Sequence, residues 1–438
     1  MSRTNRAVRQ YLDRHAEPEA AIATGVMRRF GHVLTIPAAG EGASLRSVLS
    51  SIPTGPLGDV LVILVVNGSA DAPRWITDAN IALFQQLYRD WGAGRTCGTL
   101  GTLFERPHGA LLLIDRASPD RELPARQGVG LARKIAADLA LALWRSSAIE
   151  SPWIHCTDAD VVLPSDYFEQ PMSAAPDTAA LAYRYRHVAE NVARDEAPPA
   201  APHVNRTNRS LSRAALEYEI SLRYYVRGLA YAGSPFAFHT IGSTLAVHAS
   251  AYAQVRGFPR RLAAEDFYLL NKLSKVGRVQ LLTGLPIDLS SRVSQRVPFG
   301  TGRALAEAPR KQSRQLYHPD VFDYLASWQS TLVAIAQSPE TDARTTLRQF
   351  SFPAGKDSDT LEKALDSIGA LGRAPVRART PHARLRQLQH AFDAGRTLKL
   401  IHALRDLSLP SVRLRVAIEF APFIELSTSG APLKHDIR

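Results

Sequence analysis

The sequence lacks any hydrophobic run long enough to cross a membrane as a helix, which needs about 20 apolar residues. The longest apolar runs, at residues 59–66 and 139–144, have the length of a strand or of one helix face. Residues 1–20 include basic side chains with no apolar segment behind them, so we expect no secretory signal. These features favour a cytoplasmic protein.

Cysteine is scarce as well, since Cys97 and Cys156 are the only two in the chain. They could form at most one disulfide, and in the cytoplasm both would stay reduced. Cys156 lies in an apolar stretch, which is typical of a small buried core residue. The cysteine content therefore excludes a secreted fold held together by disulfides.

Positive charge, by contrast, is in excess. The chain has 53 Lys and Arg against 41 Asp and Glu, a net charge of +12 at pH 7, and many of the basic residues follow position 372. A basic helical face there could contact the anionic inner face of a membrane, nucleic acid or an acidic partner. A solvated helix surface would explain the same residues without any partner.

Three apolar stretches predict buried strands: residues 32–42, expected to break at Pro37, residues 59–71 and residues 109–116. Helical patterns separate them, including GVGLARKIAADLALALW (128–144), which we interpret as an amphipathic helix. Continuous apolar strands alternating with helices favour an α/β fold with a mostly parallel sheet flanked by helices. We expect a helical N-terminal extension over 1–30, a catalytic domain over 31–305 and a mainly helical region over 306–438.

Two carboxylates, Asp158 and Asp160, interrupt an apolar segment at the end of another predicted strand. Neighbouring carboxylates repel, and burying them unpaired is costly, so the pair requires a cation. Ligands of parallel sheets bind beyond the carboxyl ends of the strands. At this edge, Asp-x-Asp could hold Mg²⁺ or Mn²⁺ together with the diphosphate of a nucleotide. Arg133 and Lys134 could add positive charge for the phosphates.

The order of several motifs resembles that of the family 2 glycosyltransferases, over roughly residues 33–302. The segments are LTIPAAGEG, VILVVNGSAD, GVGLARKIAADLA, HCTDADVVLPSDYF, GSTLAVHASAYAQVRGFP and AEDFYLLNKL. The resemblance implies the GT-A fold and a metal-dependent hexosyltransferase that uses a nucleotide-diphosphate sugar donor. The Gln-x-x-Arg-Trp motif of processive relatives is absent.

The resemblance also implies roles for individual residues. It assigns the donor nucleotide to Pro37, Glu41 and Asn67 together with Asp158, and the metal to Asp158 and Asp160, with Asp160 the more direct ligand. Many relatives have an acidic residue where this chain has Asn67, so the base is not specified.

The pair Glu265 and Asp266 matches the catalytic acidic motif of the family, which implies that Asp266 is the base and that transfer inverts the anomeric configuration. The same two acids begin a predicted helix, where acidic side chains also interact favourably with the helix dipole. The residues alone therefore leave both a catalytic and a capping role open.

Two further groups could complete the site. Arg292, Arg296 and Arg303 surround a Phe-Gly-Thr-Gly loop that could close over the pyrophosphate, or they could lie on a surface turn. The second group could contribute to an acceptor site or a metal shell, although a structural imidazole is the commoner role of a histidine. It consists of His239, Ser243 and His248.

Two other functions remain open. A nucleotidyltransferase that makes a nucleotide sugar would usually carry a basic residue in its first glycine-containing loop, and PAAGEGASL (37–45) has none before Arg46. A catalytically degenerate GT-A scaffold could instead use its basic surface for binding. The acceptor could be a saccharide, a small molecule or a lipid-linked compound.

Overall fold

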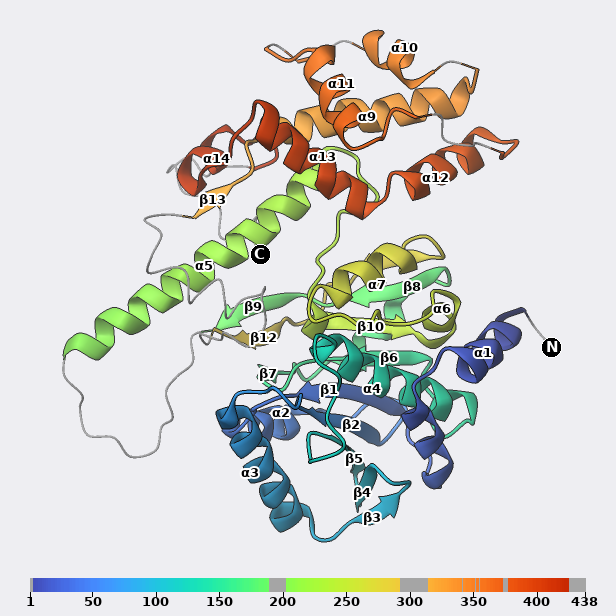
Figure 1. Cartoon of the computed structure of the whole chain (residues 1–438), viewed down its shortest axis with the longest axis vertical. Helices are drawn as coiled ribbons and strands as arrows, with labels where there is room; N and C mark the ends of the chain where they lie inside the picture. The colour runs from blue at the N-terminus through green and yellow to red at the C-terminus, as the bar shows by residue number, and fades with distance from the viewer. Residues whose placement is uncertain are drawn as a thin grey trace. The chain divides into compact units, whose positions relative to one another are not determined.

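The computed structural model describes residues 3–188, 202–291, 314–340, 342–350, 352–353, 355–372 and 377–424. The chain forms two compact units (Figure 1). The first contains residues 1–199 and 240–303, and the second contains residues 200–239 and 304–438. The second unit thus takes in residues 200–239, which the sequence-based division at residue 305 leaves with the catalytic domain.

A nine-stranded sheet forms the centre of the first unit, in the order β11-β8-β10-β6-β1-β2-β5-β4-β3. All strands except β10 and β4 run in the same direction. The expected mostly parallel α/β sheet is therefore confirmed. Its strands are β1 (His32–Ala38), β2 (Val60–Asn67), β3 (Arg95–Cys97), β4 (Gly101–Arg106), β5 (Gly109–Arg116), β6 (Trp153–Cys156), β8 (Thr178–Ala182), β10 (Leu245–His248) and β11 (Arg278–Leu281).

The central strands are buried along nearly their whole length, as expected for aliphatic strands covered on both faces. The predicted break of β1 at Pro37 is wrong, because the strand continues to Ala38 and Pro37 pairs with Val65 of β2. On the other side, the pairing of β1 with β6 extends only from Val33 to Thr35. A proline without an N–H group can be accommodated where one neighbouring strand has ended.

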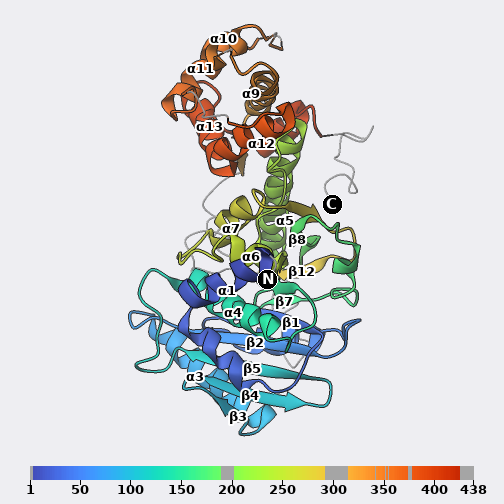
Figure 2. The ribbon, with the colours of Figure 1, turned by 90° about the vertical axis from the view of Figure 1, so that its right-hand side faces the viewer.

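Helices pack on the sheet of the first unit, and α4 contacts β1 and β2. The prediction that α4 is amphipathic is wrong, because residues 130–141 are all buried. The segments η1, α1 and α6 also contact α4 (Figure 2). The bounds are α1 (Arg3–Arg14), η1 (Pro18–Gly25), α2 (Ala43–Ser51), α3 (Arg74–Trp91), α4 (Gly128–Arg145), η2 (Gln170–Ser173), η3 (Gly242–Thr244), α6 (Ala249–Gln254) and α7 (Glu265–Leu273).

A three-stranded sheet adjoins the Asp-x-Asp turn and has the order β7-β12-β9. Its strands are β7 (Val161–Val162), β9 (Tyr185–Val188) and β12 (Ile287–Ser290). The backbone N–H of Ser290 donates to the carbonyl oxygen of Asp160 at 3.2 Å. Asp160 is therefore fixed between the end of β6 and this small sheet.

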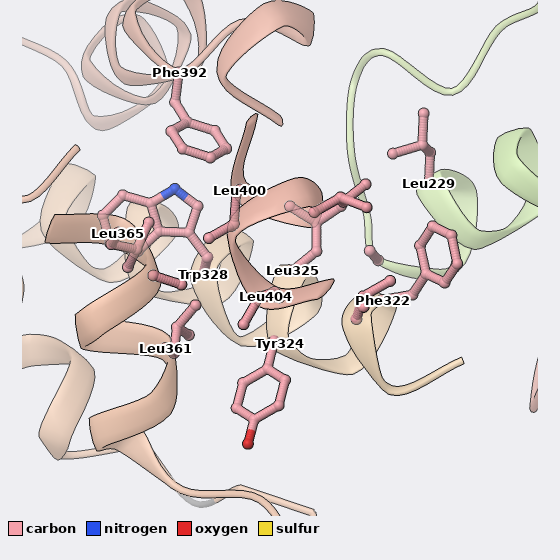
Figure 3. Close-up of a cluster of buried hydrophobic side chains, with 14 of the residues drawn as sticks. Leu229, Phe322, Tyr324, Leu325, Trp328, Leu361, Leu365, Phe392, Leu400 and Leu404 are labelled. Carbon is pink, nitrogen blue, oxygen red and sulfur yellow. The ribbon is translucent and has the colours of Figure 1, made fainter. Parts of the chain in front are cut away.

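The second unit is mainly helical, which confirms the helical C-terminal region. Its core joins Leu229 of α5 to Phe322, Leu325 and Trp328 of α9 (Figure 3). Tyr224 of α5 belongs to the same cluster. The packing explains why α5 belongs with the C-terminal helices. The elements are α5 (Pro202–Tyr231), β13 (Gln315–Leu316), α9 (Asp320–Gln337), α10 (Ala343–Arg348), α11 (Ser358–Ser367), α12 (Pro381–Ala391), α13 (Ala394–Leu407), β14 (Val412–Arg413) and α14 (Leu414–Phe420).

Within the described ranges, the structure contains no helix with the length and apolar character needed to cross a membrane. Both cysteines are buried and unbonded to each other. Short polar residues cap the helices of the second unit: Asp342, Asp357, Thr380 and Asp393 accept backbone N–H bonds at the starts of α10, α11, α12 and α13.

Candidate active site

The Asp-x-Asp turn lies at the carboxyl end of β6, as the sequence predicts. The N–H of Thr157 donates to the carbonyl oxygen of Thr35 at 3.1 Å, so the pairing with β1 persists to the residue before Asp158. Asp158 then leaves the sheet, and 38% of its side chain is exposed. The turn therefore presents a carboxylate to solvent at the edge where parallel sheets bind ligands.

A buried arginine connects this turn to a distant segment. The Arg133 guanidinium on α4 donates from Nη2 to Asp158 Oδ1 at 2.5 Å and from Nε to Glu265 Oε1 at 3.0 Å. Gly242 provides room, since a Cβ there would lie 2.7 Å from Arg133 Nη2. Burial works to lower the pKa of Arg133, but Asp158 and Glu265 raise it above its usual value, so the guanidinium stays charged.

The acidic pair begins α7 beside this arginine. Ala264, just before the helix, has a φ of 61°, a left-handed conformation that costs energy for a residue other than glycine. Asp266 is half-buried, and its Oδ1 accepts a hydrogen bond from the N–H of Phe267 at 2.7 Å. Loss of hydration, followed by the charge of Glu265, raises the pKa of Asp266 to about 7. A carboxyl with this pKa can exchange a proton near neutral pH.

The residues predicted to hold the nucleotide lie at two neighbouring strand ends: Pro37 in β1, Glu41 after it, and Asn67 at the end of β2. A side chain that the sequence reasoning missed joins the two ends. Asn80, buried on α3, donates to the carbonyl oxygen of Asn67 at 3.2 Å and accepts from the N–H of Gly40 at 2.9 Å. The sequence feature that could have identified Asn80 is its place in a helix whose other buried positions, Leu83 and Leu87, are apolar.

The three residues predicted to form an acceptor site or metal shell, His239, Ser243 and His248, do not lie together. Ser243 lies beside the Asp-x-Asp strand, and its carbonyl oxygen accepts from Thr157 Oγ1 at 3.2 Å. His248 does not reach this edge, because antiparallel pairing puts it opposite Trp153 at the start of β6. It caps α6 instead, accepting from Ser250, and burial lowers its pKa.

His239 belongs to the second unit, where burial and then the charge of Arg223 lower its pKa to about 4. A histidine with such a pKa is neutral at physiological pH. The other predicted group at the pyrophosphate, Arg292, Arg296 and Arg303, lies outside the described residues.

Lys134 does not accompany Arg133. Its ammonium group donates to Asp138 Oδ2 at 2.7 Å and to the Tyr11 hydroxyl at 2.6 Å. Asp138 is fully buried and also accepts from the Tyr252 hydroxyl and from the N–H of Glu17. The structure therefore does not support the predicted phosphate contact of Lys134. Successive residues of a helix point about 100° apart, so adjacent basic residues face different neighbours.

No cluster of three or more His, Cys, Asp or Glu side chains that could hold a metal ion occurs in the part of the chain that is described. Asp158 and Asp160 could still supply two of the hard oxygen ligands that Mg²⁺ and Mn²⁺ prefer. The remaining ligands would have to come from water and from substrate oxygens, as a diphosphate would provide. The residues fit a metal that arrives with its substrate.

No family model matches the chain, and no curated protein matches it significantly. Solved structures with a likeness include residues 1–349 of TarS from S. aureus in complex with UDP-GlcNAc, at a TM-score of 0.37 and 14% identity, covering 86% of this chain and 90% of that one. Another is a mannosyltransferase from Pyrobaculum calidifontis in complex with GDP-Man and Mn²⁺, at a TM-score of 0.34 and 16% identity, covering 92% and 93%.

Proposed function

We propose that this chain is a metal-dependent glycosyltransferase of the GT-A type, related to family 2, that moves a sugar from a nucleotide diphosphate to an acceptor hydroxyl. The Arg133 network is the observation that carries the proposal. Arg133 binds Asp158 of the Asp-x-Asp turn and Glu265, which is 132 residues away in the sequence. The network supports a single site, in which the carboxylates proposed to bind the metal and the carboxylate proposed as general base, Asp266, act on the same substrate.

In the proposed donor site, Asp158 and Asp160 hold Mn²⁺ or Mg²⁺ with the diphosphate, while Pro37, Glu41 and Asn67 bind the nucleotide. The ion, when bound, would stabilise the negative charge that develops on the departing diphosphate. Arg133 orients Asp158 by holding one of its oxygens, at 2.5 Å. Its guanidinium is engaged by the protein, so we assign it to positioning the carboxylates.

Asp266 acts as the base in this proposal. Its raised pKa, about 7, supports proton transfer from an acceptor hydroxyl near neutral pH. The hydroxyl oxygen would bond to the anomeric carbon from the face opposite the diphosphate, and the sugar–phosphate bond would break. One such displacement inverts the anomeric configuration. Glu265, held by Arg133 at 3.0 Å, supports the start of α7 on which Asp266 lies.

The protein is proposed to work in the cytoplasm, and its C-terminal helices could bring it to the inner face of an anionic membrane. Arg413, Arg415 and Phe420 are all exposed, and Phe420 is 68% exposed. Basic and aromatic side chains together suit the headgroup region of a bilayer. Co-sedimentation with phosphatidylserine vesicles, reversed by added salt, would support this contact, and no sedimentation at low salt would refute it.

Calorimetric titration with UDP-, GDP-, ADP- and TDP-sugars, with Mn²⁺ or with EDTA, tests the donor site. We expect one nucleotide to bind in the presence of Mn²⁺, and Asp160→Ala to lose this binding. Asp177→Ala is the matched control, since Asp177 is an exposed carboxylate paired only loosely with Arg278, at 3.7 Å. If the folded wild-type protein binds none of these donors, the scaffold alternative becomes the better account.

Slow transfer of the sugar to water provides a second measurement that needs no acceptor. Release of the nucleoside diphosphate from the bound donor should require Mn²⁺ and should be lost in Asp160→Ala. Synthesis of a nucleotide sugar from a nucleoside triphosphate and a sugar phosphate, without such release, would instead identify a nucleotidyltransferase.

A further inference from the structure

A cavity of about 700 Å³ lies between η1, the turn from β3 to β4, and α4. Ile22, Leu100, Leu131 and Ile135 give it an apolar wall. The described residues of the candidate active site do not line it, and Arg133 on the same helix turns toward Asp158. Small-molecule sites typically have about 300–1,000 Å³ and an apolar wall with a few polar groups. The cavity has the size and the wall of a second binding site.

Two charged side chains in this cavity have unused hydrogen-bonding atoms. The Glu19 side chain is only 5% exposed, and its Oε1 lies 3.3 Å from Arg116 Nε. Glu19 Oε2 makes no hydrogen bond with any described residue although it is buried, and the buried Arg116 Nε has the ion pair with Glu19 Oε1 but no hydrogen bond to a described residue. A buried polar atom without a partner costs about 1–3 kcal/mol. A bound hydroxyl group could serve both atoms, because it donates one hydrogen bond and accepts others.

The charges around the cavity balance. Glu17 and Glu19 line it together with Arg116 and Arg260, and Arg260 donates to both Glu17 oxygens, at 2.8 and 2.9 Å. A site for a nucleotide diphosphate would need an excess of positive charge, so this lining favours an uncharged ligand. Further neutral hydrogen-bonding groups line the cavity at Thr96, Thr99 and Gln127.

We propose that this cavity binds an uncharged sugar unit that is not itself transferred. Hydroxyl groups on the edge of the sugar would bond with Glu19 and Arg116, while the C–H face of the ring packs against Leu131 and Ile135. A pyranose combines an apolar face with hydroxylated edges, as this lining requires. The inference does not depend on the transferase activity, because none of the proposed donor or base residues takes part.

The test uses the whole protein with maltose, lactose, cellobiose and N-acetylglucosamine, in EDTA and without nucleotide. Saturation-transfer NMR detects binding, and calorimetry measures the affinity. Thr99→Trp should weaken binding at least about tenfold, since Thr99 is an exposed turn residue at the cavity and a bulky ring would fill its mouth. Ala93→Trp is the matched control, because Ala93 is exposed in the loop before β3 and does not line the cavity.

Further variants separate this cavity from a sugar-acceptor subsite beside Asp266. Glu19→Gln should weaken binding while keeping the side-chain shape, whereas Asp266→Asn should leave the affinity unchanged. Failure of all four sugars to bind would overturn the proposal and leave a solvent-filled cavity. Equal affinity in Thr99→Trp would place the bound sugar elsewhere. Tighter binding of glucose 6-phosphate than of any of the four sugars would rule out an uncharged ligand class.

Discussion

Helix α4 carries two adjacent buried basic residues that enter very different ionic clusters. Lys134 lies in a closed cluster in which Asp138 is fully buried and accepts hydrogen bonds from Tyr11, Tyr252 and the Glu17 backbone. Arg133 lies in an open cluster whose carboxylate at Asp158 is partly exposed. The first cluster satisfies its polar groups within the protein, whereas the second keeps a carboxylate accessible.

The closed cluster suits a role in stability, and the open cluster is the one that we propose to act in catalysis. A buried ion pair with complete hydrogen bonding fixes the packing around it, and breaking it is costly. In the open cluster, the carboxylates of Asp158, Glu265 and Asp266 gather near a single guanidinium, and the pKa of Asp266 is raised to about 7. Crowded like charges are typical of a site that uses a cation or a proton.

Asp266→Asn gives the largest expected effect on the open cluster. Loss of the base should reduce sugar transfer by about 10²–10⁴-fold, while Mn²⁺-dependent donor binding is retained. Initial rates and calorimetric affinities, measured with the donor that binds wild type, separate these two effects. Asp177→Asn, at an exposed carboxylate, should transfer at the wild-type rate. Normal turnover by Asp266→Asn would exclude Asp266 as the base.

Lys134→Met gives the largest expected effect on the closed cluster. It leaves Asp138 buried without its cation, so we expect a loss of about 3–5 kcal/mol in the free energy of unfolding, measured by urea denaturation. Arg278→Met is the control, because that pair is exposed and should contribute less than about 1 kcal/mol. Similar losses in the two variants would show that the closed cluster contributes no more to the free energy of unfolding than an exposed ion pair does.

Tyr11→Phe sharpens the contrast with a smaller change. The Tyr11 hydroxyl donates to Asp138 Oδ1 and accepts from Lys134, so its removal should cost about 1–3 kcal/mol in urea denaturation. Donor affinity should not change, because the open cluster is intact. Tyr88→Phe provides the comparison, since its hydroxyl makes one exposed contact with Thr102 at 3.3 Å. A loss of donor binding in Tyr11→Phe would show that the closed cluster affects the open one, and so would contradict their independence.

The pH dependence of stability gives an expected change of roughly 2–3 kcal/mol between pH 5 and pH 8, because one pKa unit corresponds to about 1.4 kcal/mol. Because folding raises the pKa of Asp266 from 3.8 to about 7, its protonated form stabilises the fold, and this contribution is lost as pH rises through 7. Asp266→Asn should therefore become more stable relative to wild type between pH 5 and pH 8. Urea denaturation at the two pH values measures the difference. An unchanged difference would contradict the raised pKa.

The sequence predicts well what depends on local patterns. The all-apolar stretches at β2 and β5 identify buried parallel strands, and the interruption at Asp158 marks the carboxyl end of β6, where we propose the active site. The β3–β4 hairpin was missed, because exposed residues such as Arg95 and Glu105 hide any strand pattern. The segment η1 falls within the helical extension expected over residues 1–30, but it is a separate 3₁₀ helix, which the sequence reasoning did not distinguish from an α-helix.

The neighbours that each side chain contacts were harder to predict than the helices and strands on which the side chains lie. Arg133 and Lys134 look equivalent in the sequence, but their partners at Glu265 and Tyr11 are both distant along the chain. The local sign was Asp138, four residues after Lys134, which suggests an ion pair along the helix. His248 could not be placed, because the sequence does not give the direction of β10.

The position of β10 has a consequence for synthesis on the ribosome. This strand lies between β8 and β6 in the sheet, yet it is translated after both of them. His248 comes 66 residues after Ala182, the end of β8, and 66 residues take roughly 3–13 s to translate at 5–20 residues per second. Until then, the apolar edges of β6 and β8 lack their partner, and open strand edges can pair with other chains. The order of the strands therefore determines how long these two edges stay unpaired during synthesis.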